Sequence, residues 1–509
     1  MSATKGSSTP LNTGTLAHLA ELGKSGVTTL PVDVAIFDRS SLRRSIVHIG
    51  VGGFHRAHLA HYVDQLCRAG NTDWSIVGAG TLPGDKKMAE VLADQDCLYS
   101  LVVKGPEETS VSVIGSIVEY IHAHPDSSAL RDQIAAPDTQ LVSMTITEGG
   151  YPVDDATGAY DKDSPVAGPD SAFGIIASAL ELRRSQGHGP LTVVSCDNIV
   201  SNGAFAKAAT LGEARQIDPA LAEWIESEVA FPNSMVDRIT PGTTDADRET
   251  LTEQTGMADQ WPVVTEPFTQ WVLEDHFAGE RPPVEDLGVI LTDNVEPYER
   301  MKLQLLNAGH SCLAYLSALI GHEYVHDAMA DDVIDSYVKE FLAIEAAPVV
   351  PPVKDIDLVD YQASLIERFS NPAIADQIAR LCLDGSVKFP KFLIPTVQAQ
   401  VDAGGPIQLS ALALAGWCRY LQGSADDGSA IEIAGDPNLE KAMAHAKAGA
   451  TDPAAFLDFE EVFGSGLRQD NRFVAAFVEA SNRLATEGAA ASITALLNNT
   501  DGLLNSTDG

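Results

Sequence analysis

The sequence predicts an α/β protein in which a domain of alternating strands and helices precedes a mostly helical domain. Between residues 46 and 200, short β-rich runs alternate with helical patterns, as is typical of βαβ units in a mainly parallel sheet. After about residue 290, apolar residues recur at helical spacing and strand candidates become few. We therefore expect one domain over residues 1–290, a second over residues 291–509, and an active site in the cleft between them.

Each expected element is a run of residues with one periodicity. In the first domain the strands are expected at Ile46–Gly50, Trp74–Ala79, Tyr99–Val103, Val111–Ile117, Gln140–Thr145 and Leu191–Cys196. Its helices are expected at Leu16–Leu22, Ala57–Arg68 and Asp170–Ser185. Helices of the second domain are expected at Glu296–Ile320, Asp331–Ile344, Leu409–Leu421 and Arg472–Arg483.

The composition limits the partners of the protein. The chain has 509 residues, of which 71 are acidic and 33 basic, so its formal net charge is −38. This charge argues against a nucleic-acid partner and an anionic membrane surface, because both carry negative charge. No stretch approaches the roughly 20 apolar residues expected of a membrane span. With no secretory signal and six scattered cysteines lacking a CxxC pair, the expected location is the cytoplasm.

A glycine-rich turn follows the first of these strands directly. Gly50, Gly52 and Gly53 stand between an apolar strand and a helical stretch, where the backbone amides of a dinucleotide-binding turn would hold a pyrophosphate. The third glycine of the GxGxxG pattern would fall at His55, so the match is partial. An ordinary strand–turn–helix that needs glycine only for its backbone angles is the alternative.

An acidic residue near the end of the second strand would bind the adenosine ribose of such a cofactor. The candidate is Asp85, although it lies further from the turn than the usual spacing of about 20 residues. Lys86 and Lys87 could instead meet the 2′-phosphate of NADP. A solvated turn without a ligand is the third interpretation of this segment.

Several blocks of sequence resemble those of the polyol-specific long-chain dehydrogenases. They stand in the order of that family between about residues 46 and 400. The blocks are Gly50-Val-Gly-Gly-Phe-His-Arg-Ala-His58, Thr145-Ile-Thr-Glu-Gly-Gly-Tyr151, Ser195-Cys-Asp-Asn198, Phe231-Pro-Asn-Ser-Met-Val-Asp-Arg-Ile-Thr-Pro241, Lys302 with Asn307 and His310, and the segment from Arg380 to Lys388.

The resemblance implies a Rossmann-type domain followed by a helical one. It also implies metal-independent hydride transfer between NAD and a polyol/ketose pair, typically mannitol and fructose, by a protein that is often monomeric. The implied roles are Lys302 as general acid/base, Glu299 as proton relay, Asn198 and Asn307 as an oxyanion pocket, His310 as the residue that orients the substrate oxygen, Asp237, Arg380 and Lys388 as polyol contacts, and Phe54, Arg56 and Glu148 as residues near the nicotinamide nucleotide. One departure is Gly84, which precedes Asp85 where NAD-selective members tend to have a second acid, so NADP remains an alternative cofactor.

The implied lysine chemistry agrees with elementary requirements. Without a metal, a lysine can accept the hydroxyl proton if burial lowers its pKa, and asparagine amides can donate hydrogen bonds to the developing alkoxide. On one α-helix, Glu299, Lys302, Asn307 and His310 would fall within a sector of about 140°. A lysine that extends along the surface towards solvent is the alternative for Lys302.

Other functions remain as alternatives. Within the same chemistry these are mannonate/fructuronate and arabinitol/xylulose interconversion. His322-Glu-Tyr-Val-His326 matches the HExxH pattern of zinc peptidases, in which two histidines one helical turn apart bind metal. A nucleotide-binding module without catalysis would bind NAD without turnover.

Overall fold

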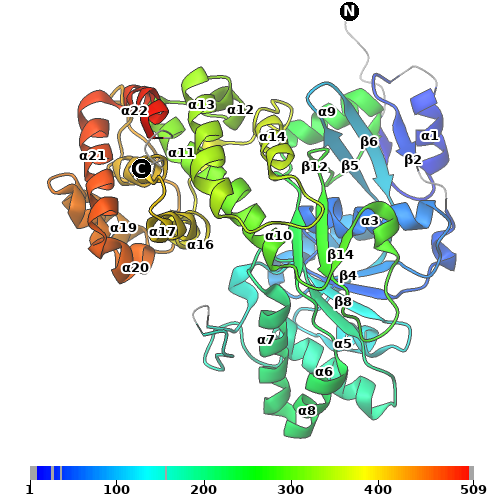
Figure 1. The fold of residues 1–509 in the computed structure, drawn as a ribbon. Helices are drawn as coiled ribbons and strands as arrows, with labels where there is room; N and C mark the ends of the chain where they lie inside the picture. Colours follow the sequence, from blue (N-terminus) through cyan, green and yellow to red (C-terminus); the bar gives the residue numbers. More distant parts are fainter. Residues whose placement is uncertain (1–7, 25–27, 35–36, 155–156, 504–509) are drawn as a thin grey trace, which may run out of the picture. The chain divides into compact units, whose positions relative to one another are not determined.

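The computed structural model describes residues 8–24, 28–34, 37–154 and 157–503 (Figure 1). The chain divides into two compact units, Met1–Glu296 and Pro297–Gly509.

The first unit is built on a five-stranded sheet in which every neighbouring pair of strands is parallel. Its order is β7-β4-β3-β8-β9, which is the 3-2-1-4-5 arrangement of dinucleotide-binding domains. The strands are β3 (Ile46–Ile49), β4 (Ile76–Gly80), β7 (Ile117–His122), β8 (Leu141–Met144) and β9 (Thr192–Ser195). Four of them are buried throughout, which explains why they read as continuous apolar runs.

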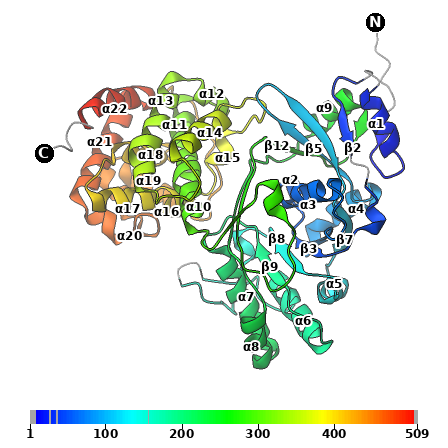
Figure 2. The same cartoon turned by 45° about the vertical axis from the view of Figure 1, so that its right-hand side comes forward.

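Helices cover both faces of this sheet (Figure 2). Alternate residues of β3 face opposite layers: Ile46 packs with the cluster that includes α3, and Val47 packs with the cluster that includes α6. The helices on the Ile46 side are α3 (Leu59–Arg68) and α4 (Lys86–Asp94), and those on the Val47 side are α5 (Ser128–Ala135), α6 (Ala172–Ser185), α7 (Asn202–Ile217) and α8 (Pro219–Glu228).

The strand expected at Val111–Ile117 is wrong, because the chain leaves one sheet and enters another within it. Strand β6 ends at Ile114, and β7 begins at Ile117. Between them the Gly115 N–H donates to Asp64 Oδ1 at 2.7 Å, and the Ser116 hydroxyl donates to a carbonyl of α3 at 2.7 Å. These contacts with a neighbouring helix, distant in sequence, set the break.

Three smaller sheets complete the unit, and most of their strands are too short to show a periodicity. They are ordered β12-β5-β6-β2, β10-β13-β14 and β1-β11. Their strands are β1 (Thr9–Pro10), β2 (Val32–Val34), β5 (Tyr99–Lys104), β6 (Thr109–Ile114), β10 (Ser234–Asp237), β11 (Met257–Ala258), β12 (Val263–Thr265), β13 (Gln270–Glu274) and β14 (Ile290–Thr292), with the helices α1 (Leu16–Lys24), α2 (Gly53–Ala57) and α9 (Asp245–Thr255) around them.

The second unit is helical over its described residues, apart from isolated bridges. Helix α18 (Gln408–Tyr420) lies in its centre, between α11 (Ala308–Ile320) and α21 (Asn471–Glu487) (Figure 2). The rings of Tyr315 and Phe389 pack in tilted orientations against Trp417 of α18 in the core of the unit. The other helices are α12 (Val325–Met329), α13 (Asp332–Glu340), α14 (Leu358–Phe369), α15 (Ile378–Leu381), α16 (Gly385–Phe392), α17 (Ile394–Ala403), α19 (Leu439–Gly449), α20 (Glu460–Gln469) and α22 (Ala489–Leu503).

The helical run Glu296–Ile320 has three parts: α10 (Glu296–Met301), a π-helical segment η5 (Lys302–Asn307) and α11. Its 25 residues are long and apolar enough to cross a membrane by length and composition, so the expectation that no stretch reaches this length is wrong. In the fold 72% of its apolar window is buried, as in many core helices.

Candidate active site

The glycine turn between β3 and α2 has the backbone that a dinucleotide-binding turn requires. Gly50 has φ +92°, and a Cβ there would lie 2.2 Å from the Thr145 carbonyl oxygen, so no other residue fits. At Gly52 a Cβ would meet nothing within 4 Å. The first glycine therefore permits the turn, and the second leaves open space where a pyrophosphate could approach the backbone.

The position of the missing third glycine is filled by a stack of two imidazole rings. The ring of His55 lies 3.4 Å from that of His48 in β3, and both are fully buried. His48 hydrogen-bonds the hydroxyls of Ser143 at 2.8 Å and Thr145 at 3.0 Å. Burial lowers the pKa of His48 to about 3, so this ring is neutral at physiological pH. The helix and strand are thus joined by packed side chains where a glycine would allow direct contact.

Arg56 lies beneath the turn, only 2% exposed. Its guanidinium donates to the carbonyl oxygens of Gly52 at 3.3 Å and Trp261 at 2.5 Å, and it lies over the rings of Tyr99 and Trp261. Burial lowers its pKa, and the charges of Tyr99 and Asp259 offset this only in part. Phe54, also on α2, stacks on the ring of His58 at 5.0 Å. Arg56 therefore supplies positive charge from below the turn.

Asp85 lies against the carboxyl end of β4. A Cβ on Gly80 would lie 2.4 Å from the Asp85 Cβ, so the glycine makes this close approach possible. One carboxylate oxygen of Asp85 accepts from the Leu82 N–H at 2.9 Å. The neighbouring cations have partners: Lys87 Nζ lies 5.0 Å from the centre of the Trp261 ring, and Lys86 Nζ lies 3.8 Å from a Glu90 oxygen.

Three further predicted residues stand at the carboxyl ends of strands in the first unit. Glu148 follows β8 and Asn198 follows β9, and both are exposed. Asp237 is the last residue of β10 and is buried. Because β8 and β9 are adjacent and parallel, Glu148 and Asn198 belong to the same edge of the sheet, which is where ligands bind in such folds.

In the second unit, four predicted residues lie on one helical run. Glu299 and Lys302 are 6% and 7% exposed, whereas Asn307 and His310 are half-buried. Lys302 is the first and Asn307 the last residue of the π-helical segment, in which N–H groups bond to carbonyls five residues earlier. The 140° sector expected for a straight α-helix is therefore wrong, because the helix winds differently between these two residues. The burial of Lys302 is also unlike that of a surface lysine.

Arg380 is held by an acid that the sequence analysis missed. Its Nε and Nη2 donate to the two carboxylate oxygens of Asp376 at 2.6 and 2.5 Å. Burial opposes the ionisation of Asp376, but the hydrogen bonds and charge of Arg380, with a further contribution from His310, outweigh it and lower the pKa of this carboxyl. The ring of His310 also packs on Phe369 at 4.3 Å. The Asp–Arg spacing of four residues was the available signal.

Lys388, on α16, is half-buried, and its Nζ lies 3.4 Å from the Leu381 carbonyl oxygen. Two of the predicted polyol contacts, Arg380 and Lys388, thus come from the neighbouring helices α15 and α16.

The HExxH match lacks the geometry of a zinc peptidase. His322 and Glu323 precede helix α12, which begins at Val325, so the two histidines are not one turn apart on a helix. His322 Nε2 lies 3.2 Å from Asp331, and His326 Nε2 lies 3.4 Å from its neighbouring aspartate. Among the residues that the structure describes, no group of three or more metal-ligating side chains is placed to hold an ion.

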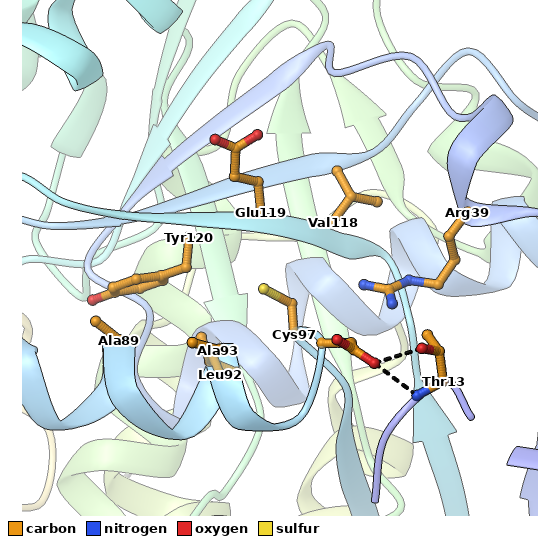
Figure 3. A pocket seen from close by; sticks show the side chains of 10 residues that line it. Thr13, Arg39, Ala89, Leu92, Ala93, Cys97, Val118, Glu119 and Tyr120 are labelled. Carbon is orange, nitrogen blue, oxygen red and sulfur yellow. Dashed lines mark hydrogen bonds between the residues drawn. The ribbon is translucent and has the colours of Figure 1, made fainter. Parts of the chain in front are cut away.

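A cavity of about 420 Å³ lies beside the edge strand β7 and is lined by none of the predicted site residues (Figure 3). Arg39 reaches into it while donating to the carbonyl oxygens of Gly115 and Ile117. The Asp96 carboxylate at the same cavity accepts from the backbone and hydroxyl of Thr13. Arg39 thus covers the start of the edge strand, and Thr13 ties the N-terminal segment to the turn that follows α4.

Comparison with known proteins agrees with a dinucleotide-binding unit that is followed by a helical unit. Residues 44–286 match the family model of the mannitol dehydrogenase Rossmann domain, and residues 294–485 match that of the mannitol dehydrogenase C-terminal domain. A mannitol 2-dehydrogenase of Phaeosphaeria nodorum is 42% identical over 91% of this chain and 83% of its own length. One of Aspergillus fumigatus is 40% identical over 94% of this chain and 97% of its own length.

Solved structures show the same likeness. The ternary complex of Pseudomonas fluorescens mannitol 2-dehydrogenase with NAD and D-mannitol is 41% identical, covers 96% of this chain and 100% of its own, and superposes with a TM-score of 0.86. A D-sorbitol dehydrogenase in substrate-free form is 35% identical, covers 92% of this chain and 99% of its own, and has a TM-score of 0.83. The chain therefore belongs to the mannitol dehydrogenase family and is a polyol dehydrogenase, an oxidoreductase that acts on a CH–OH group.

Proposed function

We propose that the protein interconverts D-mannitol and D-fructose with NAD, in the manner implied by its relatives. The observation that carries this proposal is the 41% identity, over 96% of the chain, to a protein solved with NAD and D-mannitol together. Several relatives of about 40% identity over more than 90% of the chain have the name mannitol 2-dehydrogenase. The geometry of each unit fits this chemistry.

The glycine turn is the proposed cofactor site. Gly52 and Gly53 leave space for the pyrophosphate, because a Cβ at Gly52 would meet nothing and one at Gly53 would meet only a Thr240 methyl at 3.6 Å. NAD, when bound, accepts a hydride from the polyol carbon. Arg56 favours the negative pyrophosphate through its buried charge, while Phe54 and Glu148 are proposed to lie near the nicotinamide nucleotide.

NAD is favoured over NADP by the groups around the proposed ribose site. One oxygen of Asp85 caps the turn at Leu82, which leaves the other to accept from a ribose hydroxyl. A 2′-phosphate in that place would meet the carboxylate charge. Lys86 and Lys87, which could have compensated for it, are directed towards Glu90 and Trp261.

Lys302 is the proposed acceptor of the hydroxyl proton. Its burial fits this role, because desolvation favours the neutral amine that can take up a proton. Glu299, three residues earlier and also buried, is the proposed relay towards solvent. The amides of Asn198 and Asn307 would donate to the developing alkoxide, and His310 would orient the same oxygen.

Asp237, Arg380 and Lys388 are the proposed contacts of the remaining polyol hydroxyls. Arg380 is already paired with Asp376, and this pair presents both donors and acceptors, which suits hydroxyl groups. An aldonate such as mannonate would instead require a cation without a fixed acid partner. This contact favours a neutral polyol over the mannonate/fructuronate pair.

The test measures the formation of NADH or NADPH by absorbance with a panel of substrates. The panel contains mannitol, sorbitol, arabinitol and mannonate, each with NAD and with NADP. Sorbitol is included because a D-sorbitol dehydrogenase superposes with a TM-score of 0.83. We expect the highest kcat/KM with mannitol and NAD, and activity that persists after dialysis against a chelator. No turnover of mannitol would overturn the proposal.

We further propose that the protein acts in the cytoplasm as a monomer, without nucleic-acid or membrane partners. The net charge of −38 supports the exclusion of both partners, and the burial of Glu296–Ile320 supports a place for that helix inside the fold. Light scattering coupled to gel filtration should return a mass near 53.9 kDa. A mass of twice that value would contradict the monomer.

A further inference from the structure

A closed cycle of hydrogen bonds lies beneath the carboxyl ends of strands β8 and β9. The Asp197 N–H donates to Ser195 Oγ at 3.3 Å, and Ser195 Oγ lies 2.6 Å from the hydroxyl oxygen of Tyr151. The Tyr151 hydroxyl donates to Asp197 Oδ2 at 2.7 Å. A consistent direction follows: the carboxylate can only accept, so Tyr151 donates to it and accepts from Ser195. Such a ring of donors and acceptors strengthens each member.

The same carboxylate also holds the end of the neighbouring strand. Asp197 Oδ1 accepts from the Thr147 N–H at 2.8 Å, and Oδ2 accepts from the Ile146 N–H at 3.2 Å. Thr147 has φ +63° and ψ +166°, a conformation that residues other than glycine rarely adopt. The residue after this strained position is Glu148. Asp197 therefore fixes a conformation that the local sequence would not keep by itself.

A second anchor acts on the chain just after Asp197. The side-chain amide of Asn202 donates to the Asp197 carbonyl oxygen at 3.0 Å and to the Ser234 carbonyl oxygen at 2.8 Å. The Asp197 carboxylate is thus fixed by three donors and its carbonyl oxygen by a fourth, and Asn198 is the exposed residue that follows. Ser234 begins β10, so the network also reaches the strand that ends at Asp237.

The burial of these groups points to positioning and not to contact with the reactants. Asp197 is 7% and Tyr151 is 6% exposed, whereas Asn198 and Glu148 are exposed at the strand ends above them. Burial raises the pKa of Asp197 and that of Tyr151. Keeping the Asp197 carboxylate ionised in this place therefore costs folding free energy. An apolar pair of the same size would join the two strand ends without that cost, but it could not hold the Thr147 and Ile146 N–H groups.

We propose that Asp197 and Tyr151 are positioning residues that set the orientation of Asn198 for hydride transfer. This inference rests on the proposed role of Asn198 as an alkoxide donor. The donor must stand within hydrogen-bond distance of the developing oxyanion, and displacement of such a group by about 1 Å can lower the rate about 100-fold. The cycle supplies the rigidity that this requires.

The test is a double-mutant cycle between Tyr151→Phe and Asn198→Ala. Tyr151→Phe removes one hydroxyl, and we expect kcat to fall about 10- to 100-fold while the dissociation constant for NADH changes less than about twofold. The primary deuterium isotope effect on kcat, measured with polyol deuterated at the reacting carbon, should rise because hydride transfer becomes rate-limiting. In the Asn198→Ala background the same substitution should cost less than about twofold, since the group it positions is gone.

Tyr160→Phe is the matched control. The Tyr160 hydroxyl donates to a buried carboxylate, Glu213, at 2.9 Å, and that carboxylate also accepts a backbone N–H at 2.7 Å. This pair has the same chemistry as Tyr151 and Asp197, but Tyr160 lies in the loop before α6 and Glu213 lies on α7. We expect its melting temperature to fall while kcat and the isotope effect stay unchanged. If Tyr151→Phe does not fold, Ser195→Ala opens the same cycle at another atom and replaces it in the test.

The outcomes separate the inference from the proposed function. A loss from Tyr151→Phe that persists undiminished in the Asn198→Ala background would overturn the positioning role and leave the alkoxide role of Asn198 intact. An Asn198→Ala enzyme with the kcat of the wild type would overturn the alkoxide role itself, and the positioning role with it. Unchanged kcat in Tyr151→Phe, with the fold retained, would overturn the inference alone.

Discussion

Lys302 and Asn307 stand at the two ends of a single π-helical turn. In an α-helix, side chains five residues apart diverge by about 140°, so the lysine and the asparagine would face different directions. In a π-helix, residues i and i+5 are joined by the backbone hydrogen bond and lie one turn apart. The local winding therefore brings the proposed proton acceptor and a proposed alkoxide donor to the same side of one rigid element.

Replacement of Lys302 by alanine should abolish proton transfer without disturbing the cofactor site. We expect kcat to fall by about 10³-fold or more, because general acid–base catalysis contributes about 10²–10⁴-fold. NADH affinity, measured by fluorescence quenching, should remain near the wild-type value. Lys339→Ala is the control: its Nζ pairs with Asp335 at 2.6 Å on the surface, and its loss should leave kcat unchanged. Near-normal turnover by Lys302→Ala would refute the role.

Gly50 and Gly52 should respond differently to alanine. Gly52→Ala places a methyl group in open space, so the free energy of unfolding should change by less than about 0.5 kcal/mol while NADH affinity falls at least about tenfold. Gly50→Ala meets a carbonyl oxygen at positive φ and should destabilise the fold by more than about 1 kcal/mol. Urea unfolding and NADH titration measure the two effects. Normal NADH binding by Gly52→Ala would place the pyrophosphate elsewhere.

Asp85 should determine the choice between NAD and NADP. In Asp85→Ser the carboxylate charge is removed, although a hydroxyl can still accept from Leu82 N–H. The ratio of kcat/KM with NAD to that with NADP should fall at least about tenfold, equivalent to about 1.4 kcal/mol. Asp94→Asn removes an exposed charge from the far end of α4 and should leave the ratio unchanged. An unaltered ratio in Asp85→Ser would show that the ribose is bound by another residue.

Asp376 should affect both the polyol site and the acid stability of the protein. Asp376→Asn releases Arg380 from its two hydrogen bonds, so KM for the polyol should rise about tenfold with a smaller change in kcat. Asp376→Glu keeps the charge and should restore part of the loss. An unchanged KM in Asp376→Asn would remove Arg380 from the polyol site.

The sign of the pH effect follows from the lowered pKa of Asp376. The ion pair contributes stability above the unfolded-state pKa of about 3.9, and that contribution is lost as the pH falls through the lower folded-state value. Because the Arg380 side chain is 47% exposed, the contribution is about 1 kcal/mol or less. Urea unfolding between about pH 6 and pH 3 should therefore give a shallower acid dependence for Asp376→Asn than for the wild type.

The sequence predicted those parts of the fold in which local pattern and tertiary environment agree. The buried parallel strands around β3 appear as apolar runs, and the glycine turn is visible because only glycine fits at Gly50. The strands of the small sheets are mostly two to five residues long, too short to show a period. The break at Gly115 depends on Asp64, which is 51 residues away.

The sequence predicts the candidate site as a set of residue types. It does not predict the contacts and the helical winding that hold these residues in place. The apolar pattern of Lys302–Asn307 is compatible with either an α- or a π-helix, so the winding could not be inferred from it. Tyr151 and Asp197 lie 46 residues apart, and nothing in the sequence pairs them. Asp376 was the exception, because its spacing from Arg380 is visible in the sequence and was overlooked.

All six cysteines are buried, and each has a pKa raised chiefly by burial, to about 11 for Cys97 and about 12 for Cys67, Cys382 and Cys418. Oxidants and alkylating reagents attack the thiolate, which is scarce in such environments at neutral pH. The purified enzyme should therefore keep its activity in air without a reducing agent. A cysteine introduced on its surface would then be the preferred site of reaction for a thiol-directed label.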